Sequence, residues 1–414
     1  MPIISAPRVV AQGRILAPGA VVVEGGRIAA VLDTRPPPAS DHSALSAGIL
    51  CPGLIDLQVN GAFGVDLIDA GPDGWARVGR GLLTTGVTSY LPTFISAPIE
   101  TLVAGLGRAA TAKAQVEAAA PAGTGGARIL GVHLEGPFLS QRRRGAHDPA
   151  VLVDPTAERV EALLEAAAGG FGGHGPAAGS TANRSHGGRG APRWDNLLAL
   201  MTLAPEREGA LPAIKRLTSA GVIISVGHSD AFAAQVAAAA GAGARMVTHV
   251  FNAQRPLHHR EPGVAGQALA DERLTVGLIA DLHHLHPAVC KIVLAAAHGR
   301  VALVSDAVAA AGMPPGRYWL GGELVELGED GPPRRPDGTI AGSNLRLDRA
   351  VGNVAGLGVG LVAAVEAASR VPADLLGRGD LGRIAVGALA DLALLSDEYR
   401  ALATWIDGEE AWAE

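Results

Sequence analysis

The sequence predicts an α/β fold, namely a closed (β/α)8, TIM-like barrel with a small β-sandwich domain built from both chain ends. Between residues 51 and 379, short runs rich in Val, Ile and Leu alternate with longer Ala- and Leu-rich stretches. A short run that is apolar on both faces is typical of a buried parallel strand. Its alternation with helical stretches over so long a segment favours a closed barrel.

Both chain ends have a different pattern, which predicts the small β-domain. Residues 19–24 and 27–32 are short apolar runs separated by Gly residues, and the segment 381–395 is similar. Such spacing is typical of small antiparallel strands. We expect residues 1–50 and 380–414 to form one domain beside the barrel, because the two ends of a chain with an inserted barrel lie together.

One stretch, residues 166–193, interrupts the alternation of the barrel. It is rich in Gly and Ser and nearly free of branched apolar side chains. Such a composition cannot bury enough surface to order itself, so it predicts a flexible insertion. His174 and His186 lie within it, and we expect them to be solvated, as isolated histidines in Gly-rich loops usually are.

Composition and charge exclude several classes of protein. The chain has 414 residues and a net charge of −6, with no long Lys/Arg block of the kind that binds nucleic acid. No apolar run approaches the roughly 20 residues that span a membrane. The amino terminus lacks the features of a signal peptide, and Cys51 and Cys290 have no metal-binding spacing. We therefore expect a cytoplasmic protein without a nucleic-acid or membrane partner.

Four polar side chains each follow an apolar run at the point where a strand is expected to end: Glu135, His228, His249 and Asp306. In a barrel of parallel strands, residues at the carboxyl ends face the active site, whatever the chemistry. One carboxylate and two imidazoles suit a divalent metal that keeps an open position for water. The second carboxylate, Asp306, is then free to act as the base, so the pattern predicts a metal-dependent hydrolase.

Simpler explanations exist for each of these residues taken alone. Either histidine could be a hydrogen-bonded core residue, and Asp306 could cap the Ala-rich stretch that follows it. Two histidines at successive strand ends, both after a suitable Glu, favour the metal site. His283, His284 and His286 form a dense group in which we expect at most one to touch substrate.

The first expected barrel strand, in residues 52–61, carries Gln58 and Asn60. Many two-metal hydrolases have His-x-His at the equivalent positions, and neutral amides are poor substitutes for imidazole. The sequence therefore predicts one divalent ion, with zinc as the first expectation and iron, manganese or cobalt as alternatives.

Two loop residues add to the expected site. His147 follows an Arg-rich loop that could fold back over the strand ends. Arg260 lies on a loop where only Glu261 is close in sequence, so a substrate phosphate or carboxylate could be its partner. A surface arginine is the simpler interpretation of Arg260 alone.

In combination, these motifs resemble the N-acetylglucosamine-6-phosphate deacetylase family of the amidohydrolase superfamily. The resemblance covers nearly the whole chain in the same order, through residues 52–61, 133–139, 145–147, 226–229, 248–253, 304–307, 318–322, 337–345 and 382–392. It implies a metal-bearing barrel with a small β-sandwich domain. It also implies hydrolysis of N-acetylglucosamine 6-phosphate to glucosamine 6-phosphate and acetate in amino-sugar metabolism.

The resemblance assigns roles position by position. Glu135, His228 and His249 match the metal ligands, Asp306 matches the catalytic aspartate, and His147 is expected to stabilise the oxyanion. The implied substrate contacts are Ala146, His147, Asn252, Ala253, Arg260, His284, Ile340, Ala341 and Gly342. Arg260 matches a phosphate-binding arginine that reaches across a dimer interface in similar proteins, so a homodimer is implied.

Two departures and two alternatives accompany this interpretation. The insertion has no recognised counterpart, and Asp-Leu-His-His at 281–284 replaces the usual Asp-Gly-x-His. Another amidohydrolase, such as a dihydroorotase-like enzyme or an aminohydrolase, would generally have the His-x-His that Gln58 and Asn60 replace. A non-catalytic barrel scaffold would be free to lose its ligands, yet all four key residues are present.

Overall fold

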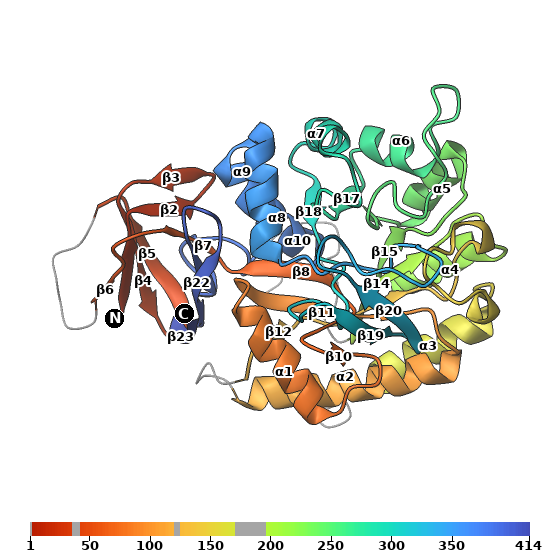
Figure 1. Ribbon diagram of the computed structural model, residues 1–414, viewed down its shortest axis with the longest axis horizontal. Helices are drawn as coiled ribbons and strands as arrows, with labels where there is room; N and C mark the ends of the chain where they lie inside the picture. Colours follow the sequence, from red (N-terminus) through yellow and green to blue (C-terminus); the bar gives the residue numbers. More distant parts are fainter. Residues whose placement is uncertain (1, 35–41, 120–124, 170–195) are drawn as a thin grey trace, which may run out of the picture.

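The computed structural model describes residues 2–34, 42–119, 125–169 and 196–414, and its largest sheet has nine strands. Eight of them form a parallel barrel with helices on its outside (Figure 1). These are β8 (Leu54–Val59), β11 (Val87–Ile95), β13 (Val132–Glu135), β14 (Leu198–Leu203), β15 (Ile223–Val226), β16 (Met246–Val247), β17 (Thr275–Leu278) and β18 (Val301–Leu303). The ninth strand, β12 (Arg128–Ile129), pairs with β11.

Contacts just beyond the first and last strands bring the ends of the barrel sheet together. Val59 and Ala307 form an isolated parallel bridge, and the backbone N–H of Asn60 donates to the carbonyl of Ala307 over 2.8 Å. The backbone N–H of Ser305 donates to Asp56 Oδ1 over 3.1 Å. Residues from opposite ends of the barrel segment therefore become neighbours at its carboxyl face.

The barrel helices bury one apolar face each. In α1 (Pro72–Leu83), Pro72 occupies the first turn, where its missing N–H is not needed, and Trp75, Val78 and Leu82 are buried at helical spacing. The other helices are α2 (Ile99–Ala119), α3 (Ala157–Gly169), α4 (Ala210–Ser219), α5 (Ala233–Ala242), α6 (Gly263–Ala270), α7 (Pro287–Ala296), α8 (Leu347–Val354), α9 (Leu361–Ala367) and α10 (Arg370–Leu375). Short turns of other helical types span Gln141–Arg143, Pro149–Val151 and Ala355–Val359.

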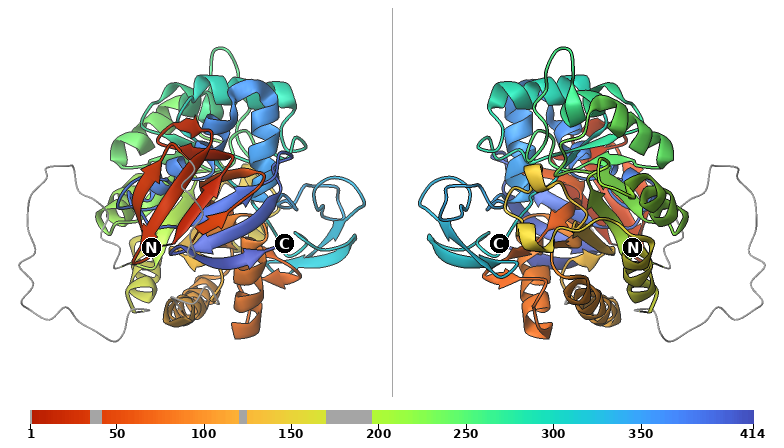
Figure 2. Two further views of the ribbon diagram at one scale, coloured as in Figure 1. Left: turned by 90° about the vertical axis from the view of Figure 1, so that its left-hand side faces the viewer. Right: turned by 90° about the vertical axis from the view of Figure 1, so that its right-hand side faces the viewer.

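Both chain ends form two sheets beside the barrel, and Figure 2 shows their strands side by side. The six-stranded sheet has the order β23-β22-β21-β7-β2-β3, and the four-stranded sheet has the order β5-β4-β1-β6. Their bounds are β1 (Ile3–Ala6), β2 (Arg8–Ala11), β3 (Arg14–Leu16), β4 (Gly19–Glu24), β5 (Arg27–Leu32), β6 (His42–Ala44), β7 (Ile49–Pro52), β21 (Leu392–Leu395), β22 (Ala401–Ile406) and β23 (Glu409–Ala413). The predicted fold class is thereby confirmed, whereas the exact division into domains stays a prediction.

The terminal strands differ from expectation in one respect. They are not all antiparallel, because β1 pairs with β6 and β2 pairs with β7 in parallel. A separate apolar core, which includes Val9, Val21, Leu50 and Trp405, packs among these strands.

Two small antiparallel pairs accompany the barrel. β9 (Gly61–Ala62) pairs with β10 (Val65–Asp66) directly after β8. β19 (Gly316–Leu320) and β20 (Glu323–Leu327) form a hairpin after β18. Leu320 and Val325 of this hairpin pack in a small apolar cluster with Val308.

The predicted start of the insertion, at residue 166, lies within a helix of the structure. Residues 166–169 belong to α3, since the Ala-rich sequence favours continued helix and Ala167 is fully buried. Residues 170–193, with His174 and His186, lie outside the described part of the chain. Within the described ranges, no helix combines the length and the apolarity that crossing a membrane requires.

Candidate metal centre

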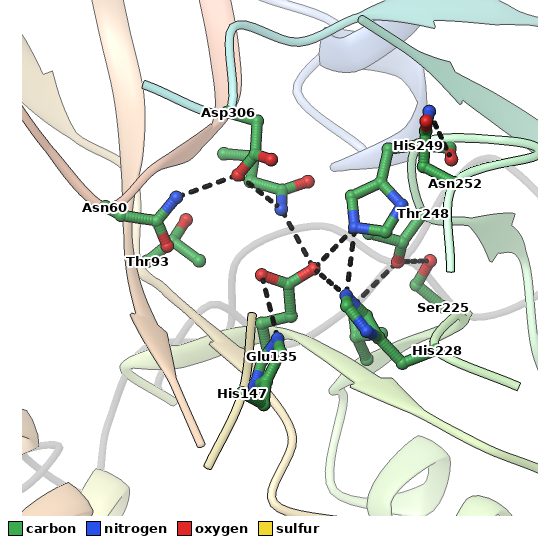
Figure 3. A network of polar contacts seen from close by, with 12 residues as sticks. Asn60, Thr93, Glu135, His147, Ser225, His228, Thr248, His249, Asn252 and Asp306 are labelled. Atoms are coloured by element: carbon green, nitrogen blue, oxygen red, sulfur yellow. Dashed lines mark hydrogen bonds and ion pairs between the residues drawn. The ribbon is translucent and has the colours of Figure 1, made fainter. Parts of the chain in front are cut away.

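Three of the predicted residues converge at the carboxyl face of the barrel (Figure 3). Glu135 is the last residue of β13, while His228 and His249 each lie two residues beyond the ends of β15 and β16. All three are buried, and one ligand atom of each lies within 4.8 Å of the others. The strand ends thus bring together the predicted carboxylate and both imidazoles.

The backbone turns sharply at three of the site residues. His228, His249 and Asp306 have φ values of 46°, 24° and 52°, in a region that non-Gly residues seldom adopt. The strands before them end earlier than the apolar runs indicate. Such backbone strain persists only where the surroundings enforce it, and it is typical of functional sites.

The donor atoms of the cluster fit a cation. His228 Nδ1 lies 3.0 Å from the carbonyl oxygen of Arg143, which can only accept, so Nδ1 carries the hydrogen and Nε2 presents a lone pair. This Nε2 lies 3.2 Å from Glu135 Oε1 and 3.1 Å from His249 Nε2. Glu135 Oε1 is also 2.9 Å from His249 Nε2. One carboxylate and two imidazoles around a single point form a donor set that suits Zn²⁺ and related ions.

Burial and charge act in opposite directions on these groups. Burial raises the pKa of Glu135, but the close contacts of its carboxylate with His228 and His249 outweigh burial and hold this pKa well below its usual value. Burial lowers the pKa of His249, whereas its hydrogen bond to Glu135 and the carboxylate charge raise it to a net value of about 8. Glu135 is therefore an ionised carboxylate at neutral pH.

Asp306 lies beside the cluster, three residues after the end of β18. Among the described residues, no helix begins directly after it, so Asp306 is not a helix cap. Its Oδ1 accepts from Gln58 Nε2 over 2.9 Å and from Asn60 Nδ2 over 2.8 Å. Burial and the negative charge of Glu135 raise the pKa of Asp306 to about 7. A carboxyl group with this pKa can both take and release a proton near neutral pH.

His147 reaches the cluster from the loop after β13. Its Nε2 lies 3.9 Å from Glu135 Oε2, and its ring packs edge-on against His228 with centroids 4.4 Å apart. The backbone N–H of Ser96 donates to His147 Nδ1 over 3.2 Å, so the ring hydrogen belongs on Nε2. Burial lowers the pKa of His147 to about 3, which leaves a neutral imidazole with Nε2–H as a donor.

A cavity of about 270 Å³ opens over these residues and contains most of the predicted contacts. Besides the three cluster residues, Asp306 and His147, the predicted residues that line it are Ala146, Asn252, Ala253, His284, Ile340 and Gly342. Ala341 is buried beside the wall in the apolar cluster of Val308, so its side chain does not line the cavity. The side-chain amide of Asn252 donates to the backbone carbonyls of His249 and Val250, which leaves its oxygen available.

Five wall residues were not assigned from the sequence: Asn60, Ile95, Gly145, Leu320 and Thr339. Asn60 and Ile95 lie at strand ends, so the rule that identified Glu135 could have found them. Gly145 has a φ of 57°, and a Cβ there would lie 3.1 Å from His228 Cε1. Leu320 comes from the β19–β20 hairpin, for which no local signal indicates a position over the barrel.

Of His283, His284 and His286, only His284 lines the cavity. Its Nδ1 lies 2.7 Å from Asp281 Oδ2, and Asp281 Oδ1 accepts the backbone N–H groups of both His283 and His284. His283 is exposed, and the exposed His286 caps α7 by accepting from the backbone N–H of Ala288. Although Asp-Leu-His-His at 281–284 differs from the usual Asp-Gly-x-His, it still places at the cavity a histidine, His284, that is hydrogen-bonded to Asp281.

Arg260 is the predicted substrate residue that lies apart from the others. It is exposed on the loop before α6, and it does not line the cavity of this chain. Its backbone N–H donates to His258 Nδ1 over 3.2 Å. In contrast, Arg142 and Arg143 of the Arg-rich loop both form ion pairs with Asp230.

The sequence of this chain is similar to those of known amidohydrolases, in agreement with the geometry of the cavity. The chain matches the amidohydrolase family over residues 49–411. An N-acetylgalactosamine-6-phosphate deacetylase of Escherichia coli O157:H7 is 36% identical, with 88% of each chain covered. The N-acetylglucosamine-6-phosphate deacetylase of Vibrio furnissii is 35% identical, over 94% of this chain and 89% of its own length.

Solved structures extend the comparison. The N-acetyl-D-glucosamine-6-phosphate deacetylase of Mycobacterium smegmatis superposes with a TM-score of 0.86 at 32% identity, covering 99% of this chain and 100% of that chain. A mutant of the enzyme was solved in complex with N-acetyl-D-glucosamine-6-phosphate. The corresponding enzyme of Pasteurella multocida has a TM-score of 0.86 at 26% identity over the full length of both chains. The chain therefore belongs to the amidohydrolase family, on the branch that contains the amino-sugar 6-phosphate deacetylases.

Proposed function

We propose that this protein is a metal-dependent deacetylase that hydrolyses N-acetyl-D-glucosamine 6-phosphate to D-glucosamine 6-phosphate and acetate, in amino-sugar catabolism. The observation that carries the proposal is one cavity that holds the Glu135–His228–His249 cluster, a buried proton acceptor and a neutral imidazole donor. The relatives named above act on sugars of this class, and they match this chain over most of its length.

Glu135, His228 and His249 would hold one divalent ion, for which zinc is our first proposal and iron, manganese or cobalt the alternatives. When bound, such an ion supplies a water of lowered pKa and polarises a carbonyl oxygen. Gln58 and Asn60 point their amide nitrogens at carboxylates, so their N–H groups act as donors rather than as ligands. This arrangement supports one ion rather than two.

Asp306 and His147 would carry the proton transfers and the oxyanion contact. Asp306 takes a proton from the attacking water and then delivers it to the nitrogen of the departing amine, so that the C–N bond breaks as a neutral amine forms. The Nε2–H of His147 is fixed by the Ser96 contact to Nδ1, and it donates to the acetamide oxygen as negative charge develops there.

The remaining residues would bind and orient the sugar phosphate. His284, held by Asp281, and the wall formed by Ala146, Asn252 and Ile340 would fix the sugar so that its acetamide faces Asp306. We propose that Arg260 binds phosphate in the cavity of a second chain within a homodimer, and that the enzyme is cytoplasmic. The exposed position of Arg260, outside its own cavity, supports a contact to another chain.

The C4 epimer, N-acetylgalactosamine 6-phosphate, is the second candidate substrate. The Escherichia coli O157:H7 relative, at 36% identity, is named for it. The two sugars carry the same acetamide and phosphate, so the roles of Glu135, Asp306 and His147 do not change between them.

Acetate release tests the proposal directly. The protein is loaded in turn with Zn²⁺, Fe²⁺, Mn²⁺ or Co²⁺ and incubated with N-acetylglucosamine 6-phosphate, its C4 epimer, or unphosphorylated N-acetylglucosamine. We expect release from a phosphorylated sugar only, and its loss after chelation. Absence of release with every metal would refute the proposed reaction, and equal release from the unphosphorylated sugar would refute the phosphate contact.

A further inference from the structure

Gln58 is a buried amide on β8 that lies between two carboxylates of the site. Its side chain and backbone are 1% exposed. Its Nε2 lies 3.0 Å from Glu135 Oε1 and 2.9 Å from Asp306 Oδ1. An amide nitrogen has two hydrogens, so one Gln58 nitrogen can donate to both groups.

The orientation of the Gln58 amide is determined by its neighbours. A carbonyl oxygen turned toward Glu135 and Asp306 would face two acceptors and be repelled. In the present orientation, Gln58 Oε1 is buried and has no hydrogen-bond partner among the described residues. An unpaired buried oxygen is unfavourable, so the two bonds donated to charged groups must outweigh that cost.

The backbone of Gln58 is also fixed relative to the segment that carries Asp306. Its N–H donates to Asp56 Oδ1 over 3.2 Å, and its carbonyl accepts from Ser305 Oγ over 3.3 Å. Ser305 directly precedes Asp306, so backbone and side chain of Gln58 act on the same strand end. Small movements of β8 against β18 are therefore restrained at this residue.

We propose that Gln58 is a positioning residue that couples the metal-ligand carboxylate to the proton-transfer carboxylate. Its N–H groups hold Glu135 Oε1 toward the two histidines and hold Asp306 Oδ1, which leaves Asp306 Oδ2 for water and substrate. The effect on turnover rests on the function proposed above. The effect on metal binding requires only the Glu135–His228–His249 cluster.

Asn60 provides a matched comparison, because it is also a buried amide on the same strand end. Its Nδ2 donates to Asp306 Oδ1 over 2.8 Å, and its Oδ1 likewise has no partner in the described part of the chain. Unlike Gln58, it has no hydrogen bond to Glu135 among the described contacts. Loss of Asn60 should therefore affect only Asp306, whereas loss of Gln58 should affect both carboxylates.

The test compares Gln58→Met with Asn60→Leu, each close in shape to the residue it replaces. Zn²⁺ affinity is measured by competition with a chromophoric chelator, and kcat and KM are measured at saturating Zn²⁺. For Gln58→Met we expect Zn²⁺ affinity and kcat each to fall roughly 10- to 100-fold, the usual effect of removing a partner of a metal ligand, with KM nearly unchanged. For Asn60→Leu we expect a lower kcat with wild-type Zn²⁺ affinity.

Gln58→Glu is the second variant, and it decides the question if Gln58→Met does not fold. A protonated Glu has one hydrogen to donate and an ionised Glu has none, so neither form can serve both carboxylates; we expect kcat to fall at least about tenfold. Wild-type kcat in a folded Gln58 variant would overturn the proposal, as would equal loss of Zn²⁺ affinity in Gln58→Met and Asn60→Leu. If the wild-type chain releases no acetate, the proposed reaction fails, and the Zn²⁺ comparison alone decides whether Gln58 positions Glu135.

Discussion

Asp306→Asn should remove most turnover while leaving metal binding intact. Oδ1 of Asp306 accepts hydrogen bonds from Gln58 and Asn60, and an Asn oxygen can accept both, so the side chain should keep its position. The variant loses only a group that can take a proton. General acid–base catalysis contributes roughly 10²- to 10⁴-fold, or about 3–5 kcal/mol of activation free energy, and we expect kcat to fall by that factor.

The same substitution should stabilise the chelator-treated protein at alkaline pH. Burial and the Glu135 charge raise the pKa of Asp306 from 3.8 to about 7. Three pKa units correspond to about 4 kcal/mol that opposes ionisation in the folded chain. Because the pKa is higher in the folded chain than in the unfolded chain, Asp306 leaves the folded protein at its full stability below pH 3.8. This stability is lost as the pH rises through about 7, where the buried carboxyl ionises. Asn carries no charge, so the free energy of unfolding of Asp306→Asn should exceed that of the wild type by about 4 kcal/mol at pH 8, and by less toward pH 5.

Urea unfolding of both proteins in chelator, at pH 8 and pH 5, measures this difference. Steady-state acetate release and zinc content measure the catalytic part on the same preparations. A variant that retains more than about a tenth of wild-type kcat would contradict the role of Asp306 as the base. A variant less stable than wild type at pH 8 would contradict the electrostatic reasoning.

Three further predictions concern residues around the site and between the sheets. Arg128→Met should cost about 3–5 kcal/mol in urea unfolding, because it leaves the buried Asp391, 3.0 Å away, unpaired, and adding Asp391→Asn should restore part of the loss. Ser96→Ala removes the hydroxyl 2.8 Å from His147 Nδ1 but keeps the backbone donor, so kcat should fall only about fivefold at constant KM. Burial raises the pKa of Asp56 to about 6, so Asp56→Asn should add up to about 3 kcal/mol at pH 8, with a smaller gain toward pH 4 in the same unfolding assay.

The barrel and its Glu135–His228–His249 cluster could be predicted from local signals. Short apolar runs that end in Glu135, His228 and His249 identify strands and the face on which their ends meet, since the carboxyl ends of parallel barrel strands share one face. The same rule applies to Asp306. The start of the predicted insertion was wrong, because helix α3 continues to Gly169 and so includes the first four residues assigned to the insertion.

Other parts of the site depend on contacts between residues far apart in the chain. Gln58 and Asp306 are 248 positions apart, yet their side chains lie 2.9 Å from each other. Leu320 lines the cavity because the β19–β20 hairpin packs against Val308, and no periodicity in its sequence indicates this. The sequence also identified Gln58 and Asn60 only as residues that are not histidine.

By itself, the sequence determined the fold class and which polar side chains gather at the strand ends, since strand-like runs and the residues that follow them are local properties. Only the tertiary structure decided which atom of each side chain donates a hydrogen bond and which accepts one. The carbonyl of Arg143 sets the tautomer of His228, the backbone N–H of Ser96 sets that of His147, and Gln58 joins Glu135 to Asp306. Hydrogen positions follow from which donor or acceptor lies opposite, and only folding brings these partners within hydrogen-bonding distance.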